Sequence, residues 1–322
     1  MKPSHFSCST QHPLQKLRDT SDTEKPNKSR DDIDVFAERV VREKLRQLKR
    51  RGMVLEKSGC LPPLCVHIHT DYGPLDQEKE RNQDYVMVLS GESKKGLPFL
   101  AIAMADGLTC SYRSDVGARL ACYCGLHSLA VDWNGRISKV SFQKAVTAGC
   151  SVLKKIRNKL SKRYLDNCPP GFYPATWDYI LSKGKLLQTT LSLILVKDGW
   201  LRAGIVGDGG FCWRSYNPKI SKSGGDCNPD VFETNAIGPS VDQRLIQLDH
   251  YVQKRISRPF LAAFYTDGVG RGLGNNALSL LDDLEGKKGG ESTNMAQAYL
   301  ERAIQKAPAL FNDNLTLAVV RL

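Results

Sequence analysis

The sequence predicts an α+β fold that is built on antiparallel β-sheets. Apolar runs of strand length come in blocks joined by short polar turns, and blocks of helical periodicity separate them. The order along the chain is strands, two helices, strands, two helices and a final strand, whereas a parallel sheet would alternate single strands with single helices. Several strands also end in an Asp-Gly pair, which is typical of a strand that runs into a sharp turn.

The chain has 322 residues, of which 41% are hydrophobic, so it is long enough for one large domain and an appendage. No apolar run approaches the stretch of about 20 residues that a bilayer requires, and the first residues lack a signal-peptide pattern. We therefore expect a cytoplasmic protein with no transmembrane segment. Its ten cysteines include no Cys-x-x-Cys pair, which argues against a zinc ribbon, and we expect most of them to be reduced, buried and structural.

The N-terminal region divides into a tail and a basic helix. Residues 1–30 are polar and lack periodic apolar positions, which predicts a disordered tail. Residues 31–62 are predicted to hold a basic amphipathic helix, capped by Asp31 or Asp32 and ending near Arg51, and then a linker. The apolar stripe of this helix either docks it on the folded domain or leaves a basic surface for nucleic acid or a membrane. The net charge of +12 suits an anionic partner without identifying one.

The folded domain is predicted over residues 63–322, and its first half contains strands followed by helices. Apolar runs predict strands at residues 64–70, 84–89 and 99–105. Helical periodicity predicts helices from residue 114, over residues 139–166 and over residues 177–181. The two prolines after Cys168 end the long second helix, because proline cannot continue a helix.

The second half of the domain begins and ends with strands. Strands are predicted at residues 185–196, 200–206, 211–215, 261–266 and 314–322. Helices are predicted at about residues 277–284 and 292–306. The segment at about residues 217–240 is rich in Gly, Pro, Asn and Ser, which predicts a variable surface insertion.

Acidic residues follow several of the apolar strands. Three strands end in Asp-Gly, and a fourth acid lies between two asparagines before the last strand: Asp106, Asp208, Asp267 and Asp313. Any one Asp-Gly pair is more typical of a hairpin turn, but the repetition favours a shared site. Carboxylates at close quarters repel one another unless a cation lies between them, and Mg²⁺ and Mn²⁺ prefer oxygen ligands. The pattern therefore predicts an all-oxygen metal site.

The same motifs resemble those of the metal-dependent Ser/Thr protein phosphatases, the protein phosphatase 2C or PPM family, in its bacterial-type branch. Five motifs appear in the family's order: Arg81-Asn82-Gln83-Asp84, Ala105-Asp106-Gly107, Gly207-Asp208-Gly209, Thr266-Asp267-Gly268 and Asp313-Asn314-Leu315-Thr316. The segment over residues 112–121 resembles a helix start found in bacterial members. The resemblance extends over about residues 66–322, and it rests on the order and spacing of the motifs more than on any one of them.

This resemblance implies an antiparallel β-sandwich flanked by helices on both sides, with the N-terminal helix as an extension. It implies that residues 63–322 form a phosphatase domain. The implied reaction is hydrolysis of phosphoserine and phosphothreonine on proteins by a hydroxide that bridges two divalent metals. The implied cofactor is Mn²⁺ or Mg²⁺, two per site, and some members hold a third. The implied partners are a phosphorylated protein substrate and a cognate Ser/Thr kinase.

The resemblance also implies roles for individual residues. Asp106 would bridge two metals, and the carbonyl oxygen of Gly107 would bind one of them. Asp267 and Asp313 would complete the first metal site, and Asp84 would act on the second, mostly through water. Asp208, together with Asp267, lies where family members hold the third, weaker metal.

Two cations at or just before the first motif are candidates for binding the substrate phosphate. The family's phosphate-binding arginine lies a few residues before this motif, where the chain has Lys79, and Arg81 at the start of the motif lies nearby. Lysine binds phosphate as a point charge, whereas arginine can bind two oxygens at once. The alternative for both is a solvated surface cation.

The chain departs from the family at two positions, and these motivate an alternative function. Gln83 stands where the family often has glutamate, and Leu108 follows Gly107 where a histidine or methionine is common. A weak or inactive pseudophosphatase that binds a phosphoprotein or kinase is therefore the alternative. A nucleic-acid-binding function has no supporting RNP, zinc-finger or helix-turn-helix pattern.

Overall fold

The structure is a computed structural model of the chain. It describes residues 32–56, 59–61, 64–71, 82–92, 98–132, 137–164, 168–169, 173–215, 221–224, 235–242, 246–256, 259–274, 277–285, 294–311 and 313–321. The predicted disordered tail over residues 1–30 lies outside these ranges, as do Lys79 and Arg81. Much of the predicted insertion at residues 217–240 also lies outside them.

One sheet contains six strands, and every neighbouring pair is antiparallel. The strand order is β1-β4-β5-β6-β7-β10. The strands are β1 (Val54–Glu56), β4 (Tyr85–Glu92), β5 (Pro98–Ala105), β6 (Leu191–Lys197), β7 (Trp200–Val206) and β10 (His250–Arg255). A tight turn joins β6 to β7, with Asp198 and Gly199 both at positive φ, as a two-residue hairpin requires.

The other sheet also has six antiparallel strands, in the order β2-β3-β12-β11-β8-β9. The strands are β2 (Gly59–Leu61), β3 (Leu64–Asp71), β8 (Gly210–Arg214), β9 (Ser221–Gly224), β11 (Leu261–Tyr265) and β12 (Leu315–Arg321). The closing strand β12 lies inside the sheet between β3 and β11, so residues from both ends of the domain meet there.

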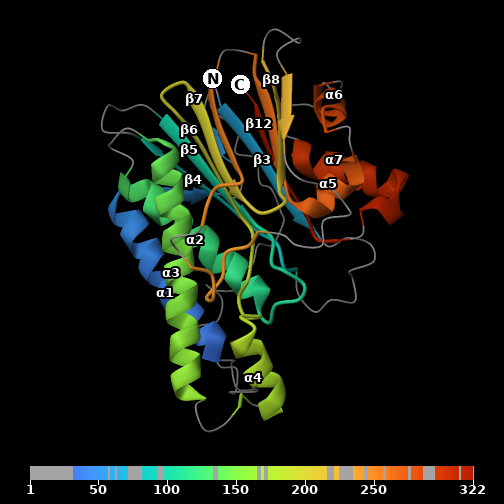
Figure 1. Ribbon diagram of the computed structural model, residues 1–322. Helices are drawn as coiled ribbons and strands as arrows, with labels where there is room; N and C mark the ends of the chain where they lie inside the picture. Colours follow the sequence, from blue (N-terminus) through green and yellow to red (C-terminus); the bar gives the residue numbers. More distant parts are fainter. Residues whose placement is uncertain are drawn as a thin grey trace, which may run out of the picture.

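The helices cover the outer faces of the two sheets (Figure 1). On the side of the first sheet, α2 (Ser114–Asp132) and α3 (Lys139–Arg163) contact its strands, and α1 (Asp32–Arg50) packs on α2. Helix α4 (Pro174–Ser182) lies beyond the ends of the strands (Figure 1). The helices over the second sheet are α5 (Asp267–Leu273), α6 (Ser279–Glu285) and α7 (Met295–Lys306), and a short 3₁₀ turn, η1 (Pro308–Leu310), follows α7. The predicted sandwich with helices on both sides is confirmed.

Three apolar layers hold this arrangement together. One lies between the first sheet and its helices, one lies between the two sheets, and one lies between the second sheet and α5 to α7. Along a strand, residues of the layer between the sheets alternate with residues of an outer layer, because successive side chains of a strand point to opposite faces. In β5, for example, Ile102 and Met104 face the other sheet, and Ala101 and Ala103 face the helices.

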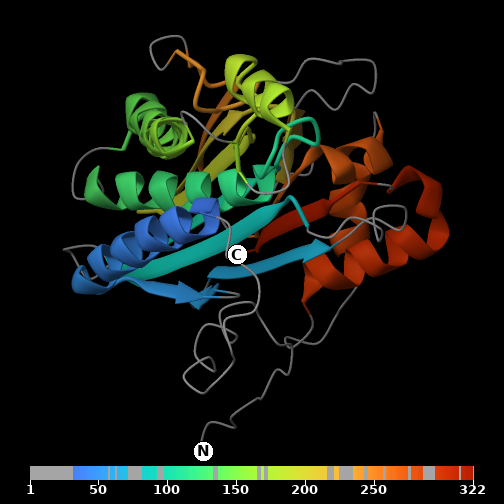
Figure 2. The same cartoon turned by 90° about the horizontal axis from the view of Figure 1, so that it is seen from below.

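Helix α1 packs against α2 and lies beside α3 (Figure 2). Its apolar stripe is buried at Ile33, Ala37, Val41 and Leu48. Ion pairs fix its first turn, from Asp32 to Arg163 at 2.7 Å and from Asp34 to Arg113 at 2.5 Å. Of the two interpretations of the stripe, the structure shows the docked one, and most of the basic side chains of the helix face outward.

Several elements differ from the sequence prediction. The strand predicted at residues 185–196 begins only at Leu191, because the residues before it make isolated bridges instead of joining a ladder. Leu186 bridges Tyr112, and Thr189 bridges both Gly107 and Ile237. The short strands β1, β2, β9 and β10 and the helix α5 were not predicted. Strand β10 (HYVQKR) is a partly exposed edge strand, so it lacks the apolar run that reveals a buried strand.

Among the described residues, no helix is long and apolar enough to cross a membrane.

The packing of α2 against α1 predicts an acid-sensitive contact at His127. Burial and the nearby charges of Lys44 and Arg51 lower the pKa of His127 to about 4, and Lys44 Nζ lies 3.4 Å from His127 Nδ1. The unfolded chain therefore binds more protons than the folded one between pH 6.5 and 4, so the unfolding free energy should fall by about 1–2 kcal/mol as the pH is lowered through this range. Urea titrations of wild type and His127→Gln at several pH values test this. An equally steep decline in the variant would contradict it.

Candidate functional site

Four acidic residues of the sequence motifs lie at the ends of strands that are neighbours in the sheets. Asp106 follows β5 and Asp84 precedes β4, and the pairing of Tyr85 with Ala105 places these two acids side by side. Asp267 follows β11 and Asp313 precedes β12, which pairs with β11. Antiparallel pairing therefore brings the end of one strand to the start of the next at the same edge.

The carboxyl groups of Asp84, Asp106 and Asp267 meet at this edge. Asp106 lies within hydrogen-bonding reach of both of the others. Burial, followed by the charges of Asp84 and Asp267, raises the pKa of Asp106 well above its usual range. Burial also raises the pKa of Asp84 to about 7. Three carboxyls in contact cannot all ionise in a buried site unless a cation compensates them.

Two threonines fix the orientation of Asp84. Its Oδ2 atom accepts hydrogen bonds from Thr316 Oγ1 at 2.7 Å and from Thr266 Oγ1 at 2.9 Å. Thr266 also accepts the backbone N–H of Thr316 at 3.0 Å, which ties β11 to β12. The Oδ2 atom of Asp84 is thus hydrogen-bonded to side chains that are not part of the acid cluster.

The other carboxylate oxygens are left without donors. Within the described part of the chain, Oδ1 of Asp84 and Oδ1 of Asp267 are buried and have no hydrogen-bond partner. A buried carboxylate oxygen without a donor is unfavourable by about 1–3 kcal/mol or more, so such atoms call for an ion or another donor. The two atoms belong to residues that contact the same third carboxyl, Asp106.

Two neighbouring threonines hold the backbone of Asp106. Its N–H donates to Thr190 Oγ1 at 2.9 Å, and its carbonyl oxygen accepts from Thr189 Oγ1 at 2.6 Å and from the Thr190 N–H at 2.8 Å. Both threonines are buried. They come from the segment that precedes β6, so this segment gives up strand pairing in order to bind the Asp106 loop.

Glycines allow the motif segments to approach closely. A Cβ atom on Gly268 would lie 2.2 Å from the carbonyl oxygen of Asn314, and one on Gly107 would lie 2.7 Å from the backbone of Ser114. Only glycine fits at either place without a shift of the backbone. The glycine after the acid therefore has a packing role in both motifs.

Arg271 links the two acids that come from the second sheet. It lies four residues after Asp267 on α5. Its Nη2 atom binds Asp267 Oδ2, and its Nη1 atom binds Asp313 Oδ2 at 3.0 Å. The charges of Asp208 and Asp106 also act on it. Asp208 is thus close enough to belong to the same negative field, although it follows β7 rather than a central strand.

Gln83 does not extend the acid cluster. Its amide nitrogen donates to Ser114 Oγ at 3.1 Å, and its amide oxygen accepts from Thr109 Oγ1 at 3.4 Å. It therefore ties the first motif to the start of α2. The Gln83 carbonyl oxygen also accepts the N–H of Gly107 at 3.1 Å, which connects the first two motifs.

In the described part of the chain, no group of three or more His, Cys, Asp or Glu side chains is arranged to hold a metal ion. Thr266 and Thr316 engage one oxygen of Asp84, and Arg271 engages one oxygen each of Asp267 and Asp313. The donor set itself fits a hard divalent cation, since it is all oxygen, buried and in excess negative charge.

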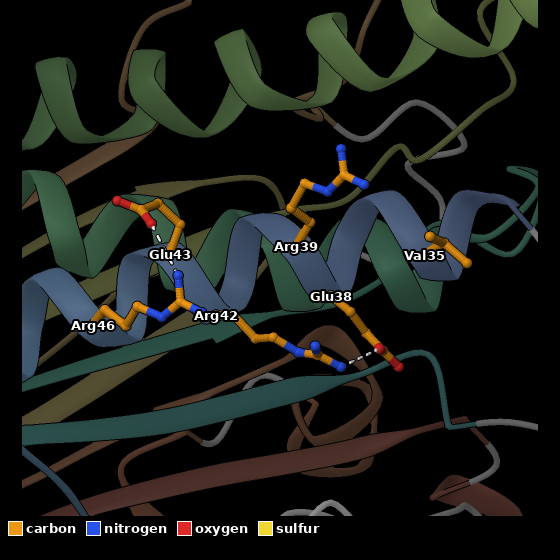
Figure 3. A pocket seen from close by; sticks show the side chains of 6 residues that line it. All are labelled: Val35, Glu38, Arg39, Arg42, Glu43 and Arg46. Carbon is orange, nitrogen blue, oxygen red and sulfur yellow. Dashed lines mark hydrogen bonds and ion pairs between the residues drawn. The ribbon is translucent and has the colours of Figure 1, made fainter.

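A groove along the outer face of α1 is a separate feature. Val35, Glu38, Arg39, Arg42, Glu43 and Arg46 line it. Arg42 pairs with Glu38 at 3.1 Å and Arg46 lies 3.8 Å from Glu43, while Arg39 points toward α3 (Figure 3). The groove belongs to the helix layer over the first sheet, whereas Asp267 begins a helix over the second sheet. It has no titratable cluster comparable to the acids.

Sequence reasoning missed three residues of the site. Arg271 could have been found from its spacing, because residues four apart on a helix are neighbours, but α5 itself was not predicted. Thr266 and Thr316 belong to the motifs themselves, yet nothing in the sequence indicates that both donate to Asp84.

The comparisons with known proteins agree with this geometry. The family model described as Protein phosphatase 2C matches residues 76–225. The structure of serine-threonine phosphatase 2C from Toxoplasma gondii has a TM-score of 0.56 and 13% identity, covering 84% of this chain and 98% of that one. The catalytic domain of the serine threonine protein phosphatase PstP in complex with 2 manganese ions has a TM-score of 0.50 and 17% identity, covering 84% and 98%. At these identities the structures show a shared fold. No curated protein matches the sequence.

The close approach at Gly268 leads to a stability prediction. Gly268→Ala should lower the unfolding free energy by about 2–3 kcal/mol or more, because its Cβ would overlap the Asn314 carbonyl oxygen. Gly149→Ala on α3 is the matched control, since its Cβ would make an ordinary contact at 3.5 Å, and it should be neutral or stabilising by about 0.5–1 kcal/mol. Chemical denaturation of both variants measures the difference. Equal stabilities would show that the two motif segments do not lie this close.

Proposed function

The chain belongs to the protein phosphatase 2C family through the match over residues 76–225, and from this premise we propose that it is a metal-dependent phosphatase acting on phosphoserine and phosphothreonine in proteins. The observation that carries the proposal is the contact of the half-buried carboxyl of Asp106 with the buried carboxyls of Asp84 and Asp267. Such a cluster is unfavourable by itself and becomes favourable when divalent cations bind, which supports a role in binding them.

The proposed ligands are the acids of the motifs. Asp106 would contact two ions, with the Gly107 carbonyl oxygen on one of them. Asp267 and Asp313 would serve the first ion, Asp84 the second, and Asp208 with Asp267 a third. The buried, unpartnered Oδ1 atoms of Asp84 and Asp267 support this assignment. When bound, Mn²⁺ or Mg²⁺ would supply an activated water near neutral pH and would offset the charge of the phosphoryl oxygens.

The residues around the acids hold them in place for this role. Thr266 and Thr316 leave Asp84 one free oxygen, and Thr189 and Thr190 fix the backbone on either side of the Asp106 peptide. Ligands that are held by a surrounding shell of hydrogen bonds lose less entropy when they bind an ion. The strands that carry these acids also hold them in place.

The proposed contacts for the substrate phosphate lie outside the described residues. They are Lys79 and Arg81, cations at or just before the first motif. Leu108 follows Gly107, so this position offers no proton donor for the departing alcohol. The overall reaction transfers the phosphoryl group from the serine or threonine oxygen to water, and the leaving oxygen gains a proton. A Ser/Thr kinase that makes these phosphoproteins would be the cognate partner.

Replacing the shared carboxylates tests the proposal. Asp106→Asn and Asp267→Asn should each lower Mn²⁺-dependent hydrolysis of an aryl phosphate on the order of 10²–10³-fold, because each removes charge from the proposed ion sites. Asp208→Asn should have a smaller effect. Asp282→Asn on α6, whose exposed carboxylate pairs with Arg214 at 2.7 Å, is the control and should retain wild-type rates.

The outcome separates the enzyme from the alternative. Turnover that requires Mn²⁺ or Mg²⁺ and is lost with EDTA supports the enzyme. Absence of turnover with any divalent ion, with retained binding of a phosphopeptide measured by calorimetry, would favour a phosphoprotein-binding module on the same fold. Wild-type rates in Asp106→Asn would remove this acid from the mechanism.

A further inference from the structure

We propose that Arg271 is an internal counter-ion that competes with divalent cations for Asp267 and Asp313, so that metal binding requires its guanidinium to leave these carboxylates. This inference rests on the proposed metal-dependent function, and it adds a residue that controls how readily the site is loaded.

The geometry of Arg271 is that of a bridge between two separate chain segments. One guanidinium nitrogen binds Asp267, which begins α5, and the other binds Asp313 at 3.0 Å, which precedes β12. A guanidinium is planar and remains charged, so it can satisfy two carboxylates at once in a way that a lysine ammonium cannot. The same two carboxylates are the proposed ligands of the first ion.

Arg271 occupies one oxygen of each of these two carboxylates. It binds Oδ2 of Asp267, while Oδ1 of that residue remains buried without a partner in the described part of the chain. It also binds Oδ2 of Asp313, whose Oδ1 accepts the N–H of Asn314 at 2.9 Å. While Arg271 is bound, Asp267 can offer an ion only Oδ1, and both oxygens of Asp313 already accept hydrogen bonds. An ion that binds both acids therefore competes with Arg271, whose side chain is the most exposed of the three.

Arg271 is placed so that it can leave. Its side chain is 44% exposed, compared with 8% for that of Asp267. A partly exposed cation can move into water without leaving a buried donor unsatisfied. A displaced guanidinium would still lie near Asp208 and Asp106, which also act on its charge.

Competition of this kind lowers the apparent affinity for metal. An ion binds only the fraction of molecules in which the carboxylates are free, so the dissociation constant rises by the inverse of that fraction. Coupling free energies between two binding equilibria in one protein typically correspond to about 5–150-fold in affinity. The site would then load at higher ion concentrations than the same carboxylates would without Arg271.

The test is a calorimetric titration in which Mn²⁺ is added to the full chain after all metal has been removed from it. Arg271→Ala should bind Mn²⁺ about tenfold tighter than wild type, and Arg271→Lys should be intermediate because one ammonium cannot bridge both acids. Arg255→Ala is the control, since Arg255 is an exposed arginine at the end of the edge strand β10 of the other sheet, and it should bind as wild type does.

A thermal melt of the same variants provides a second readout. Without metal, Arg271→Ala should melt at a lower temperature than wild type, because Asp267 and Asp313 lose their counter-charge. Saturating Mn²⁺ should then raise its melting temperature by more than it raises that of wild type, because the ion no longer displaces a protein cation. Arg271→Lys keeps the measurement interpretable if the alanine variant does not fold.

Unchanged or weaker Mn²⁺ binding in both Arg271 variants would overturn the inference. So would unchanged Mn²⁺ binding accompanied by a raised KM for a phosphopeptide, which would make Arg271 a substrate contact instead. The proposed function fails separately: a wild-type chain that binds Mn²⁺ but does not hydrolyse phosphate esters would refute the phosphatase and leave the competition measurable.

Discussion

The mutual repulsion of buried carboxyls is the constraint on which the rest of this structure depends. Asp84 and Asp267 are buried, Asp106 between them is half-buried, and burial raises the pKa of both Asp84 and Asp106. A fold keeps such a cluster only if something compensates it. In this chain threonine hydroxyls and Arg271 supply part of this compensation, and under the proposed function divalent cations would supply the rest.

The sandwich architecture explains how such distant acids meet. Each acid lies at the end of a strand, and antiparallel neighbours bring those ends to one edge of the two sheets. The layers of apolar side chains between and outside the sheets make the strands rigid, and glycine at position 268 lets the chain segments pass within contact distance. The acid cluster is therefore held by the most buried parts of the fold, while the cation that faces it, Arg271, lies near the surface.

Much of this fold follows from patterns that are visible in the sequence. Buried strands such as β5 and β11 are continuous apolar runs, and the long helix α3 has a clear helical period, so both were predicted. Edge strands such as β10 were missed because half-exposed positions carry polar residues. Arg271 was missed because its role depends on α5, a short helix rich in glycine, and on Asp313, which lies far away in the sequence. Contacts between segments remote in sequence are set by tertiary packing and leave no local pattern.

The most direct test of the cation site is anomalous X-ray diffraction at the manganese edge from crystals soaked in Mn²⁺. The account predicts anomalous peaks bounded by the carboxylates of Asp84, Asp106 and Asp267, with the Arg271 guanidinium displaced from Asp267 and Asp313. Crystals with manganese only at the surface, and with the acid cluster unchanged beside Arg271, would contradict it.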